Sequence, residues 1–371
     1  MSTAPRVAIV HDWLVGGGAE RVIQTLHELY PDAPIYTSYA TKEWRDKLDG
    51  KVVTGWLQYL GPLRKFIPFL RIWWFTSLNF DEYDVVISSS GNGEAKGVKT
   101  SDDTLHICYC HAPTHFYWRH YDQYVKEPGF GIFNPLARLG LRLLVGPLRK
   151  WDVKASQRPD YFIANSTHTA SEIKTFYKRD AVVIHPPVDT SRFMEVAEPK
   201  VRKGFVTAGR LVPYKRVDLI IQACNELGAP LNVIGRGPEL EKLQALAGPT
   251  ILFHSDVSDE EMPYFLASAE AFIFAAYEDF GITPVEAMAC GTPVIAYQAG
   301  GALDYVIEGK TGAFFSEQSV ASLVDRIKQF NRSDYSSVAV RKHAATFDTQ
   351  ESQAKLRETI DSFTDKTIQR D

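Results

Sequence analysis

Short apolar runs alternate along the chain with stretches whose apolar residues recur at helical spacing. In the first half, a helical pattern at 19–30 accompanies strand-like runs at residues 6–13, 84–90, 105–111 and 161–166. In the second half, such runs occupy residues 204–210, 230–235, 250–255, 271–276 and 293–297. Strands that alternate with helices pair in parallel, so the pattern predicts an α/β protein with two parallel, doubly wound sheets.

An extended segment at residues 185–193 separates the two sets of strands. Its two consecutive prolines disfavour helix, so we expect a hinge here between a domain at 1–187 and a second at 188–348. The last residues, 349–371, have a helical pattern and add no strand. We expect this helix to pack back on the first domain.

The composition is that of an ordinary globular protein, with 371 residues, 45% apolar and 23% charged. The 41 Lys and Arg against 45 Asp and Glu give a net charge of -4, so we expect no nucleic-acid partner. An anionic ligand would have to be held by local charges. The chain shows neither a signal-peptide pattern at its start nor an uninterrupted apolar run of membrane-spanning length. We therefore expect a cytoplasmic protein.

The four cysteines are too few for a disulfide framework in a chain of this length, which indicates a reducing compartment. Cys108, Cys110 and His111 could be imagined as metal ligands, but no second cluster supplies the missing ones. The period-two spacing of the cysteines fits one face of a strand. We therefore expect no metal site.

Two segments of the first half, residues 56–75 and 133–151, break the α/β rhythm. Both interleave cations with aromatic or leucine side chains, as at Trp56, Arg64, Lys65, Phe66, Phe69, Arg71, Trp73, Trp74, Phe133, Arg138, Arg142, Arg149 and Lys150. Such segments favour the headgroup region of an anionic bilayer, which would make the protein peripheral on the inner membrane face. Alternatively, each is a core-packing helix with a solvated basic face.

Ligands of doubly wound sheets bind at the carboxyl ends of the strands, so the residues after each strand are the candidates. Gly16, Gly17 and Gly18 lie between the first strand and its helix, where backbone N–H groups and the helix dipole could hold an anion. A glycine-rich turn can also serve the bend alone. The full dinucleotide fingerprint is absent.

Two cations follow the first strand of the second half. Arg210 ends the run 204–210, and we expect Lys215 in the first turn of the next helix. A guanidinium fork and an ammonium at one helix N-terminus suit a diphosphate, whereas a solvated surface pair is the alternative.

A third candidate, beginning at Glu278, follows the run 271–276. We expect a helix that starts at about Thr283, capped by that residue and ended by Gly291, with Glu286 in its first turn. The helix N-terminus could face a phosphate, Glu286 could bind a ribose diol, and Glu278 could bind sugar hydroxyls. Alternatively, both glutamates only complement the helix dipole.

Together these motifs resemble the retaining, GT-B-fold glycosyltransferases of family 4. The likeness rests on E-D-F-G-x-x-x-x-E with A-M-A-x-G-T-P-V-I-A, on Gly300 and Gly301, on the upstream G-R-L-x-x-x-K and on the N-terminal glycine loop. It covers essentially the whole chain. The segments CYCHAPTHFYW, NSTHTASEIKTFY and HPPVD look most like bacterial mannosyltransferases that use GDP-mannose to build polysaccharide or lipid-linked oligosaccharides. The chain departs from that pattern at His115, where arginine is usual.

The resemblance implies two Rossmann-like domains facing across a cleft, the first for the acceptor and the second for the donor. It implies a nucleotide-sugar donor such as GDP-mannose, an isoprenoid-linked or glycan acceptor, and no metal or other cofactor. Four residues would be catalytic: Arg210 and Lys215 at the diphosphate, and Glu278 and His111 at the transferred sugar. The other donor-binding positions would be Gly17 and Gly18 over the phosphates, Glu286 at the ribose, Phe280, Gly281, Ile282 and Thr283 around the sugar and helix start, and Gly235, Arg236 and Val257 at the base.

In the implied reaction, the bond between the anomeric carbon and the diphosphate breaks, and the acceptor attacks from the same face. The cations oppose the charge on the leaving phosphate. They also disfavour a glycosidase built on the two glutamates. A UDP-sugar transferase, a nucleotide-sugar epimerase or phosphorylase of the same fold, and a non-catalytic sugar-nucleotide-binding subunit stay open as alternatives.

Overall fold

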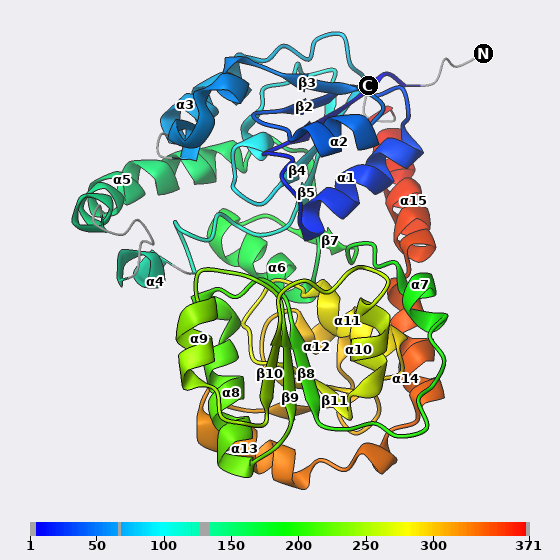
Figure 1. The fold of residues 1–371 in the computed structure, drawn as a ribbon. Helices are drawn as coiled ribbons and strands as arrows, with labels where there is room; N and C mark the ends of the chain where they lie inside the picture. The colour runs from blue at the N-terminus through cyan, green and yellow to red at the C-terminus, as the bar shows by residue number, and fades with distance from the viewer. Residues whose placement is uncertain (1–4, 66–67, 120, 127–133, 369–371) are drawn as a thin grey trace. The chain divides into compact units, whose positions relative to one another are not determined.

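The computed structural model describes residues 5–65, 68–119, 121–126 and 134–368. The chain divides into two compact units, the first of Met1–Pro186 with Gln353–Asp371 and the second of Pro187–Ser352. Figure 1 shows a sheet flanked by helices in each unit. The prediction of two parallel sheets is confirmed, because every strand pair in both sheets is parallel.

The first unit contains seven strands in the order β3-β2-β1-β4-β5-β6-β7. They are β1 (Val7–His11), β2 (Ile35–Thr37), β3 (Val52–Thr54), β4 (Val85–Ser90), β5 (Leu105–Cys110), β6 (Tyr161–Ala164) and β7 (Ala181–Val183). The apolar runs predict β1, β4, β5 and β6. The other three strands have only three residues each, too few to show a periodic pattern.

The α-helices of this unit are α1 (Gly18–Leu29), α2 (Lys42–Lys47), α3 (Pro68–Ser77), α4 (Tyr121–Lys126), α5 (Asn134–Ala155) and α6 (Thr167–Glu172). The other helical segments are the 3-10 helices η1 (Trp56–Lys65) and η2 (Ala95–Gly97) and the π-helical η4 (Ile173–Tyr177). The central strands are buried on both faces. Alternate residues of β1 therefore enter two cores, Ile9 on one side and Val10 on the other.

The second unit contains six strands in the order β10-β9-β8-β11-β12-β13. They are β8 (Phe205–Ala208), β9 (Leu231–Ile234), β10 (Ile251–His254), β11 (Ala271–Phe274), β12 (Val294–Tyr297) and β13 (Gly312–Phe315). Its α-helices are α7 (Thr190–Met194), α8 (Val217–Leu227), α9 (Leu240–Leu246), α10 (Met262–Ser268), α11 (Ile282–Ala289), α12 (Ala302–Tyr305), α13 (Val320–Gln329) and α14 (Ser337–Ala344). The 3-10 turns are η5 (Pro213–Lys215), η6 (Arg332–Asp334) and η7 (Ala345–Phe347).

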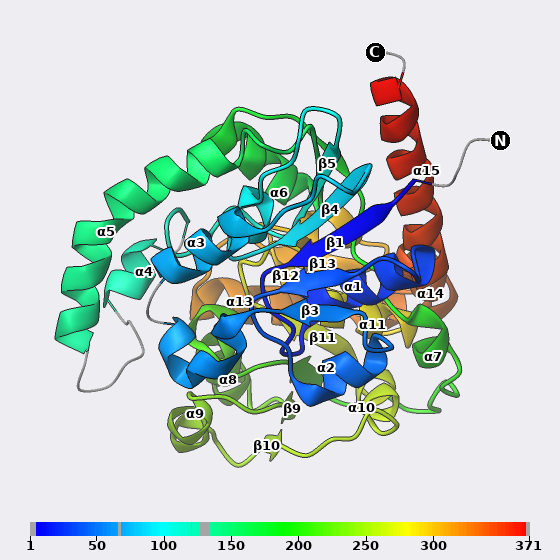
Figure 2. The same ribbon diagram turned by 90° about the horizontal axis from the view of Figure 1, so that it is seen from above.

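The last helix, α15 (Thr349–Ile368), brings the end of the chain to the first unit. Leu356, Ile360 and Phe363 lie on one face of this helix and join the core that also contains residues of α1. The Phe363 ring stacks on that of Tyr161 in β6 at 4.0 Å between centroids. Figures 1 and 2 show α15 beside α1.

The aromatic segment at 56–75 is only partly the exposed cationic surface that its sequence suggests. Arg71 is buried, and its guanidinium lies 2.6 Å from the carboxylate of Glu94. Trp74 is buried in the core beside Phe75. The prediction that Arg71 and Trp74 face a bilayer is therefore wrong, because a buried guanidinium requires an internal carboxylate and the large indole fills the core. Phe66 and Phe133 of the two predicted segments lie outside the described residues.

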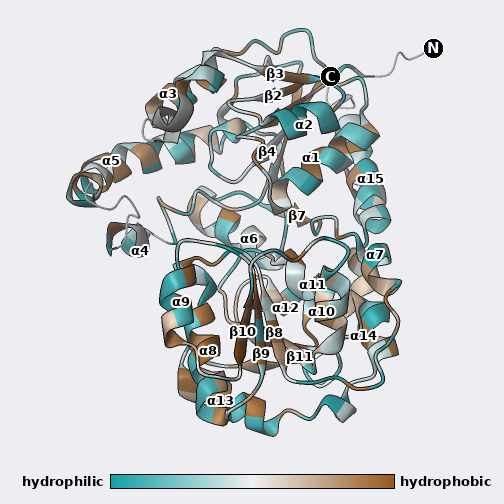
Figure 3. Ribbon diagram, in the orientation of Figure 1, coloured by the Kyte–Doolittle hydropathy of each residue, from teal (hydrophilic) through white to brown (hydrophobic). Residues whose placement is uncertain are grey.

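The outer part of α5 is exposed or half-buried along its length, and Arg138 there donates to the carbonyls of Val125 and Lys126 in α4. Residues 134–147 include no buried side chain, whereas Leu148, Asp152 and Ala155 near the other end are buried. Figures 1 and 2 show this outer part standing clear of the sheet of the first unit. Figure 3 shows hydrophobic and hydrophilic residues interleaved along it. Among the described residues, no helix combines the length and the apolarity needed to cross a bilayer.

Candidate active site

Two loops approach each other closely at the carboxyl ends of β8 and β9. Gly209 follows β8 and Gly235 follows β9, and a Cβ atom at Gly235 would lie 2.0 Å from the carbonyl oxygen of Gly209. Gly235 also has a φ of +134°, a conformation that favours glycine. This approach shapes a small pocket lined mainly by Gly209, Arg210, Lys215, Ile234 and Phe274.

Lys215 lies in the 3-10 turn η5 rather than in the first turn of α8, which begins only at Val217. Lys215 was predicted in the first turn of this helix but lies in the turn before it. The two are separate because Arg216, between them, adopts a left-handed conformation. The Lys215 ammonium lies 2.5 Å from the carboxylate of Glu278, and both side chains are mostly buried. The structure thus joins a cation that follows β8 to a carboxylate that follows β11.

Arg210 lies beside this pair at the carboxyl end of β8, and its side chain is exposed. Its guanidinium donates to the Tyr214 hydroxyl at 3.4 Å. Both predicted phosphate-binding cations therefore occur at the carboxyl end of β8. Because the Arg210 side chain is exposed, its guanidinium can turn toward an anionic ligand. This movement would leave no buried carboxylate without its cation.

The turn before α11 depends on glycine. Gly281 has a φ of +91°, and a Cβ atom there would lie 2.8 Å from the Phe274 ring. Gly301 donates its N–H to the Glu278 carbonyl at 2.9 Å, and a Cβ at this residue would lie 2.3 Å from the Cα of Phe280. The loop that carries Glu278 is therefore packed against a second loop at main-chain distance.

The helix α11 begins at Ile282 with Gly281 as its N-cap, and no side chain caps it. The prediction that Thr283 is the N-cap is wrong, because the turn at Gly281 starts the helix earlier. Glu286 consequently lies in the second turn and is buried. The first N–H groups of α11 carry the positive end of its dipole to the strand edge where Lys215 lies.

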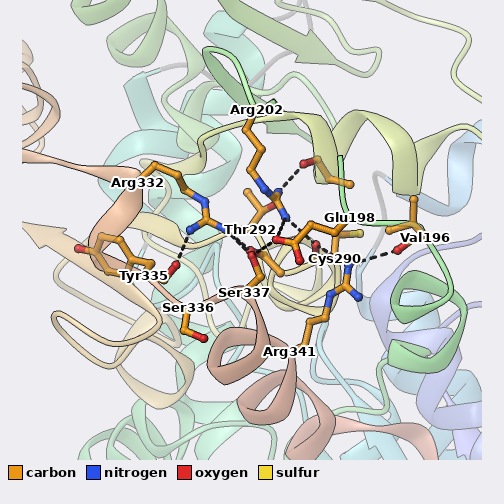
Figure 4. Close-up of polar contacts among 12 residues, drawn as sticks. Val196, Glu198, Arg202, Cys290, Thr292, Arg332, Tyr335, Ser336, Ser337 and Arg341 are labelled. Carbon is orange, nitrogen blue, oxygen red and sulfur yellow. Dashed lines mark hydrogen bonds and ion pairs between the residues drawn. The ribbon is translucent and has the colours of Figure 1, made fainter. Parts of the chain in front are cut away.

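Three arginines hold the opposite end of α11 (Figure 4). Arg202 and Arg341 donate to the Cys290 carbonyl at 3.2 and 3.3 Å, and Arg332 donates to the Gly291 carbonyl at 3.1 Å. Burial, together with the charge of Arg332, lowers the pKa of Arg202 to about 10. Cations at a helix C-terminus oppose the negative end of the dipole, so the cluster stabilises the helix that positions Glu286.

The predicted base-binding residues lie at the carboxyl ends of β9 and β10. The Arg236 guanidinium donates to the Ser255 carbonyl at 2.8 Å and forms an ion pair with Asp256. Val257 is half-buried and packs on the core of the unit. These residues and Gly235 lie at the carboxyl ends of β9 and β10, next to the pocket that contains Arg210.

In the first unit, the glycine loop after β1 already holds a carboxylate. The buried Glu20 accepts the N–H groups of Val15 and Gly16 at 3.1 and 2.9 Å. The helix α1 begins at Gly18, and its N-cap Gly17 has no side-chain hydrogen bond. The predicted phosphate-facing positions Gly17 and Gly18 are therefore at the helix start, beside a negative charge that the sequence reasoning did not anticipate.

His111 directly follows β5, as the pattern predicts. Its Nε2 lies 2.7 Å from the hydroxyl of Ser89 in β4. His11 at the end of β1 contacts the same serine. The predicted site residues of the first unit are thus at the carboxyl ends of β1 and β5, on either side of β4.

Asp12 is a site-forming residue that the sequence analysis missed. Its buried carboxylate accepts N–H groups from Gly91, Asn92 and Ala95 at 2.7–2.8 Å. It fixes the loop that follows β4. A carboxylate near the end of the strand-like run 6–13 was the available signal, but its partners lie about eighty residues away and depend on strand order.

Comparisons with known proteins match family models to both halves of the chain. A family model described as "Glycosyltransferase Family 4" matches residues 16–192, and one described as "Glycosyl transferases group 1" matches residues 190–347. The chain belongs to glycosyltransferase family 4. The two matched regions of this family 4 chain meet at the boundary between its two units.

Two curated relatives of the family 4 chain are mannosyltransferases. A GDP-mannose-dependent alpha-(1-6)-phosphatidylinositol monomannoside mannosyltransferase of Mycolicibacterium smegmatis is 29% identical over 53% of this chain and 63% of the relative. The alpha-1,3/1,6-mannosyltransferase alg2 of Schizosaccharomyces pombe is 24% identical over 84% of this chain and 70% of the relative. The chain therefore spans under two thirds of the length of the first relative.

Solved structures show that the family 4 chain has the GT-B fold. Anabaena HepE, crystallised with UDP and glucose, matches with a TM-score of 0.66 and 17% identity over 97% of this chain and all of that one. Sucrose-phosphate synthase of Thermosynechococcus elongatus matches with a TM-score of 0.68 and 15% identity over 97% and 99% of the two chains. The predicted fold class is thus confirmed over nearly the whole chain.

Proposed function

We propose that this family 4 chain is a retaining mannosyltransferase that takes mannose from GDP-mannose and transfers it to a lipid-linked or polysaccharide-precursor acceptor. The observation that carries the proposal is the ion pair between Lys215 and Glu278 beside the exposed Arg210. Cations and a sugar-binding carboxylate are thereby assembled at one sheet edge. The names of the mannosyltransferase relatives support mannose as the transferred sugar.

In the proposed reaction, Arg210 and Lys215 bind the donor diphosphate and oppose the charge that develops on it as the glycosidic bond breaks. Removal of one such donor typically lowers kcat by roughly 100- to 1,000-fold. The first N–H groups of α11 add positive potential. These groups neutralise the leaving phosphate without a metal ion.

Glu278 and Glu286 have separate roles in this proposal. The Lys215 contact orients Glu278 toward the same edge, where its second oxygen can accept a sugar hydroxyl. Glu286 binds the ribose diol from the second turn of α11. His111 binds the transferred sugar from the first unit, and the acceptor hydroxyl attacks on the face that the diphosphate leaves.

Thermal denaturation with nucleoside diphosphates tests the donor site. We expect GDP to raise Tm more than UDP, ADP or TDP, because a ligand at 100 times its Kd stabilises the folded state by about 2.7 kcal/mol. Arg210→Ala should abolish the shift. Arg326→Ala, which removes the same charge from an ion pair with Glu308 in the same unit, should retain it.

Each other outcome has a definite meaning. A shift selective for UDP would contradict the mannosyl assignment and favour a UDP-sugar transferase or an epimerase of this fold. No shift with any of the four nucleotides would contradict the donor site. A GDP shift followed by mannose transfer to an undecaprenyl-linked acceptor would support the complete proposal.

We further propose that the acceptor is met at an anionic membrane surface. The outer part of α5 exposes Leu136, Leu139 and Leu143, at 68, 54 and 67%, and the stretch 134–151 contains no acidic residue. A helix of this kind can bury leucines among acyl chains while its arginines meet lipid phosphates.

Aromatic side chains near α3 extend this surface. Phe69 and Trp73 are spaced four residues apart and exposed, and the Trp73 ring lies 5.8 Å from that of the partly exposed Trp56. Tyr59 in η1 is the most exposed of the group. Amphipathic rings of this type prefer the membrane interface.

Co-sedimentation with phosphatidylglycerol–phosphatidylcholine vesicles tests the membrane proposal. The triple variant Leu136→Ser, Leu139→Ser, Leu143→Ser should lose binding, while its GDP-induced Tm shift remains. A control that removes three exposed apolar side chains of the second unit, Leu252→Ser, Tyr264→Ser and Val338→Ser, should bind like the parent. Equal sedimentation of the two triple variants would contradict the proposal.

A further inference from the structure

Three adjacent strands of the first unit bring two histidines to one serine. His11 ends β1, Ser89 lies in β4, and His111 follows β5. The parallel register places His11 opposite Ser89. His11 and Ser89 are buried, and His111 is partly exposed.

The contacts of His11 determine where its proton lies. Its Nδ1 is 3.0 Å from the carbonyl oxygen of Ser89 and 3.1 Å from the Ser89 hydroxyl oxygen. A carbonyl oxygen can only accept, so Nδ1 of His11 must carry a hydrogen. That hydrogen faces both oxygens of Ser89.

A serine hydroxyl has one hydrogen to donate and two lone pairs that can accept. Among the described contacts of the Ser89 hydroxyl, Nδ1 of His11 already carries a hydrogen, so Nε2 of His111, 2.7 Å away, is the group that can accept the serine hydrogen. A nitrogen that accepts a hydrogen bond in a neutral imidazole bears no proton, and the proton is then on the other ring nitrogen.

We infer that Ser89 and His11 are positioning residues that hold His111 in the neutral tautomer with the proton on Nδ1. This inference rests on the proposed function, in which His111 binds the transferred sugar. His111 is thereby a hydrogen-bond donor through Nδ1, suited to a sugar hydroxyl oxygen. Ser89 also fixes the ring direction, as orienting partners do for other functional histidines.

A second serine–histidine pair in the same sheet supplies a matched control. The Ser88 hydroxyl lies 2.9 Å from Nε2 of His106, and both residues are fully buried. Ser88 and Ser89 are neighbours in β4 and therefore face opposite sides of the sheet. The two pairs share their chemistry, but only the one with Ser89 includes a residue of the proposed site.

Nitrogen-15 NMR of the full-length protein tests the tautomer without any ligand. With labelled histidines, and with His111 assigned by the signal that disappears in His111→Gln, we expect a protonated Nδ1 and an unprotonated Nε2. In Ser89→Ala this preference should be lost, whereas in Ser88→Ala it should persist. A proton found on Nε2 of His111 in the neutral parent would overturn the inference.

Hydrolysis of GDP-mannose, followed by GDP release, tests the consequence for catalysis. Ser89→Ala should lower kcat about tenfold, the effect of one lost hydrogen bond, with KM and the GDP-induced Tm shift unchanged. Ser89→Thr should restore kcat to within about threefold of the parent, and Ser88→Ala should leave it unchanged. Parental kcat in Ser89→Ala would overturn the positioning role.

The two proposals can fail independently. If no nucleotide shifts Tm, the donor site is contradicted, although the NMR result still decides the tautomer. If GDP shifts Tm and the tautomer is the opposite one, only the inference on Ser89 and His11 fails.

Discussion

Six strands of the first sheet, β3 to β6, have the same order as the six strands of the second, and the two sheets differ at the point where that order reverses. In the first, the reversal lies between β1 and β4, where the buried Asp12 carboxylate binds the N–H groups of the loop after β4. In the second, it lies between β8 and β11, where Lys215 and the exposed Arg210 are placed. The point where the strand order reverses is called the switch point of the sheet. At this point the first sheet has an internal carboxylate, whereas the second has cations.

The difference supports the proposal that the donor phosphates bind to the second unit. Backbone N–H groups that already bind Asp12 are satisfied, and a second anion beside them would be repelled. The cationic edge of the second unit offers opposite charge instead. The comparison therefore predicts that substitutions at the edge of the first unit reduce stability, whereas those at the edge of the second reduce ligand binding.

Lys96→Met should have the largest effect on stability. Lys96 is fully buried with its ammonium 2.6 Å from Asp152; burial lowers its pKa, but the charge and hydrogen bond of Asp152 outweigh this and raise it. The variant leaves Asp152 uncompensated, so we expect a loss of about 3–5 kcal/mol in urea unfolding of the first unit. Lys47→Met removes the ammonium from an exposed pair with Glu43 and should cost under about 0.5 kcal/mol. Similar losses of unfolding free energy in the two variants would contradict the expected difference between the buried and the exposed ion pair.

The buried His106 should make the first unit sensitive to acid. Burial, with the charges of Arg158 and Arg179, lowers its pKa from 6.5 to about 3. The unfolded chain then binds a proton that the folded chain does not, so the stability present above pH 6.5 is lost as the pH falls toward 3. Between pH 6.5 and 4 the parent should lose about 3 kcal/mol more than His106→Gln. Parallel pH profiles of unfolding free energy would contradict this.

The smallest effects compare the two switch points directly. Asp12→Asn replaces one accepting oxygen with a donor and should cost about 2 kcal/mol, the penalty of unsatisfied buried N–H groups. Arg210→Ala removes an exposed side chain and should change the unfolding free energy by less than about 0.5 kcal/mol. A larger loss of stability in Arg210→Ala than in Asp12→Asn would reverse the comparison.

The longer buried strands could be predicted from the sequence because their apolar runs reflect burial on both faces. The short β2, β3 and β7 could not, since three residues carry no period and their pairing depends on distant partners. The N-cap of α11 was predicted two residues late, at Thr283 instead of Gly281, because a glycine turn at positive φ rather than a capping side chain starts the helix.

The candidate site could be predicted as far as its residues follow strands. Arg210, Lys215, Glu278 and His111 all lie directly after a strand or in the loop that follows it. Their partners could not be predicted, since the contact between Lys215 and Glu278 joins residues 63 positions apart. The Ser89 contact with two histidines likewise depends on strand order, which a single sequence does not display.

The uneven burial of α5 also determines where a protease can act on it. Asp152 fixes the inner end, because its carboxylate accepts from the Trp118 indole and the Tyr177 hydroxyl at 2.7 and 2.8 Å. The outer turns include no buried side chain and are held to α4 through the bonds of Arg138 to the carbonyls of Val125 and Lys126, so they should open at lower cost than the inner end. Within this helix, trypsin should therefore cut at Arg142 before it cuts at Lys154. Protection of Arg142 by anionic vesicles would support the proposal that this part of α5 binds lipid.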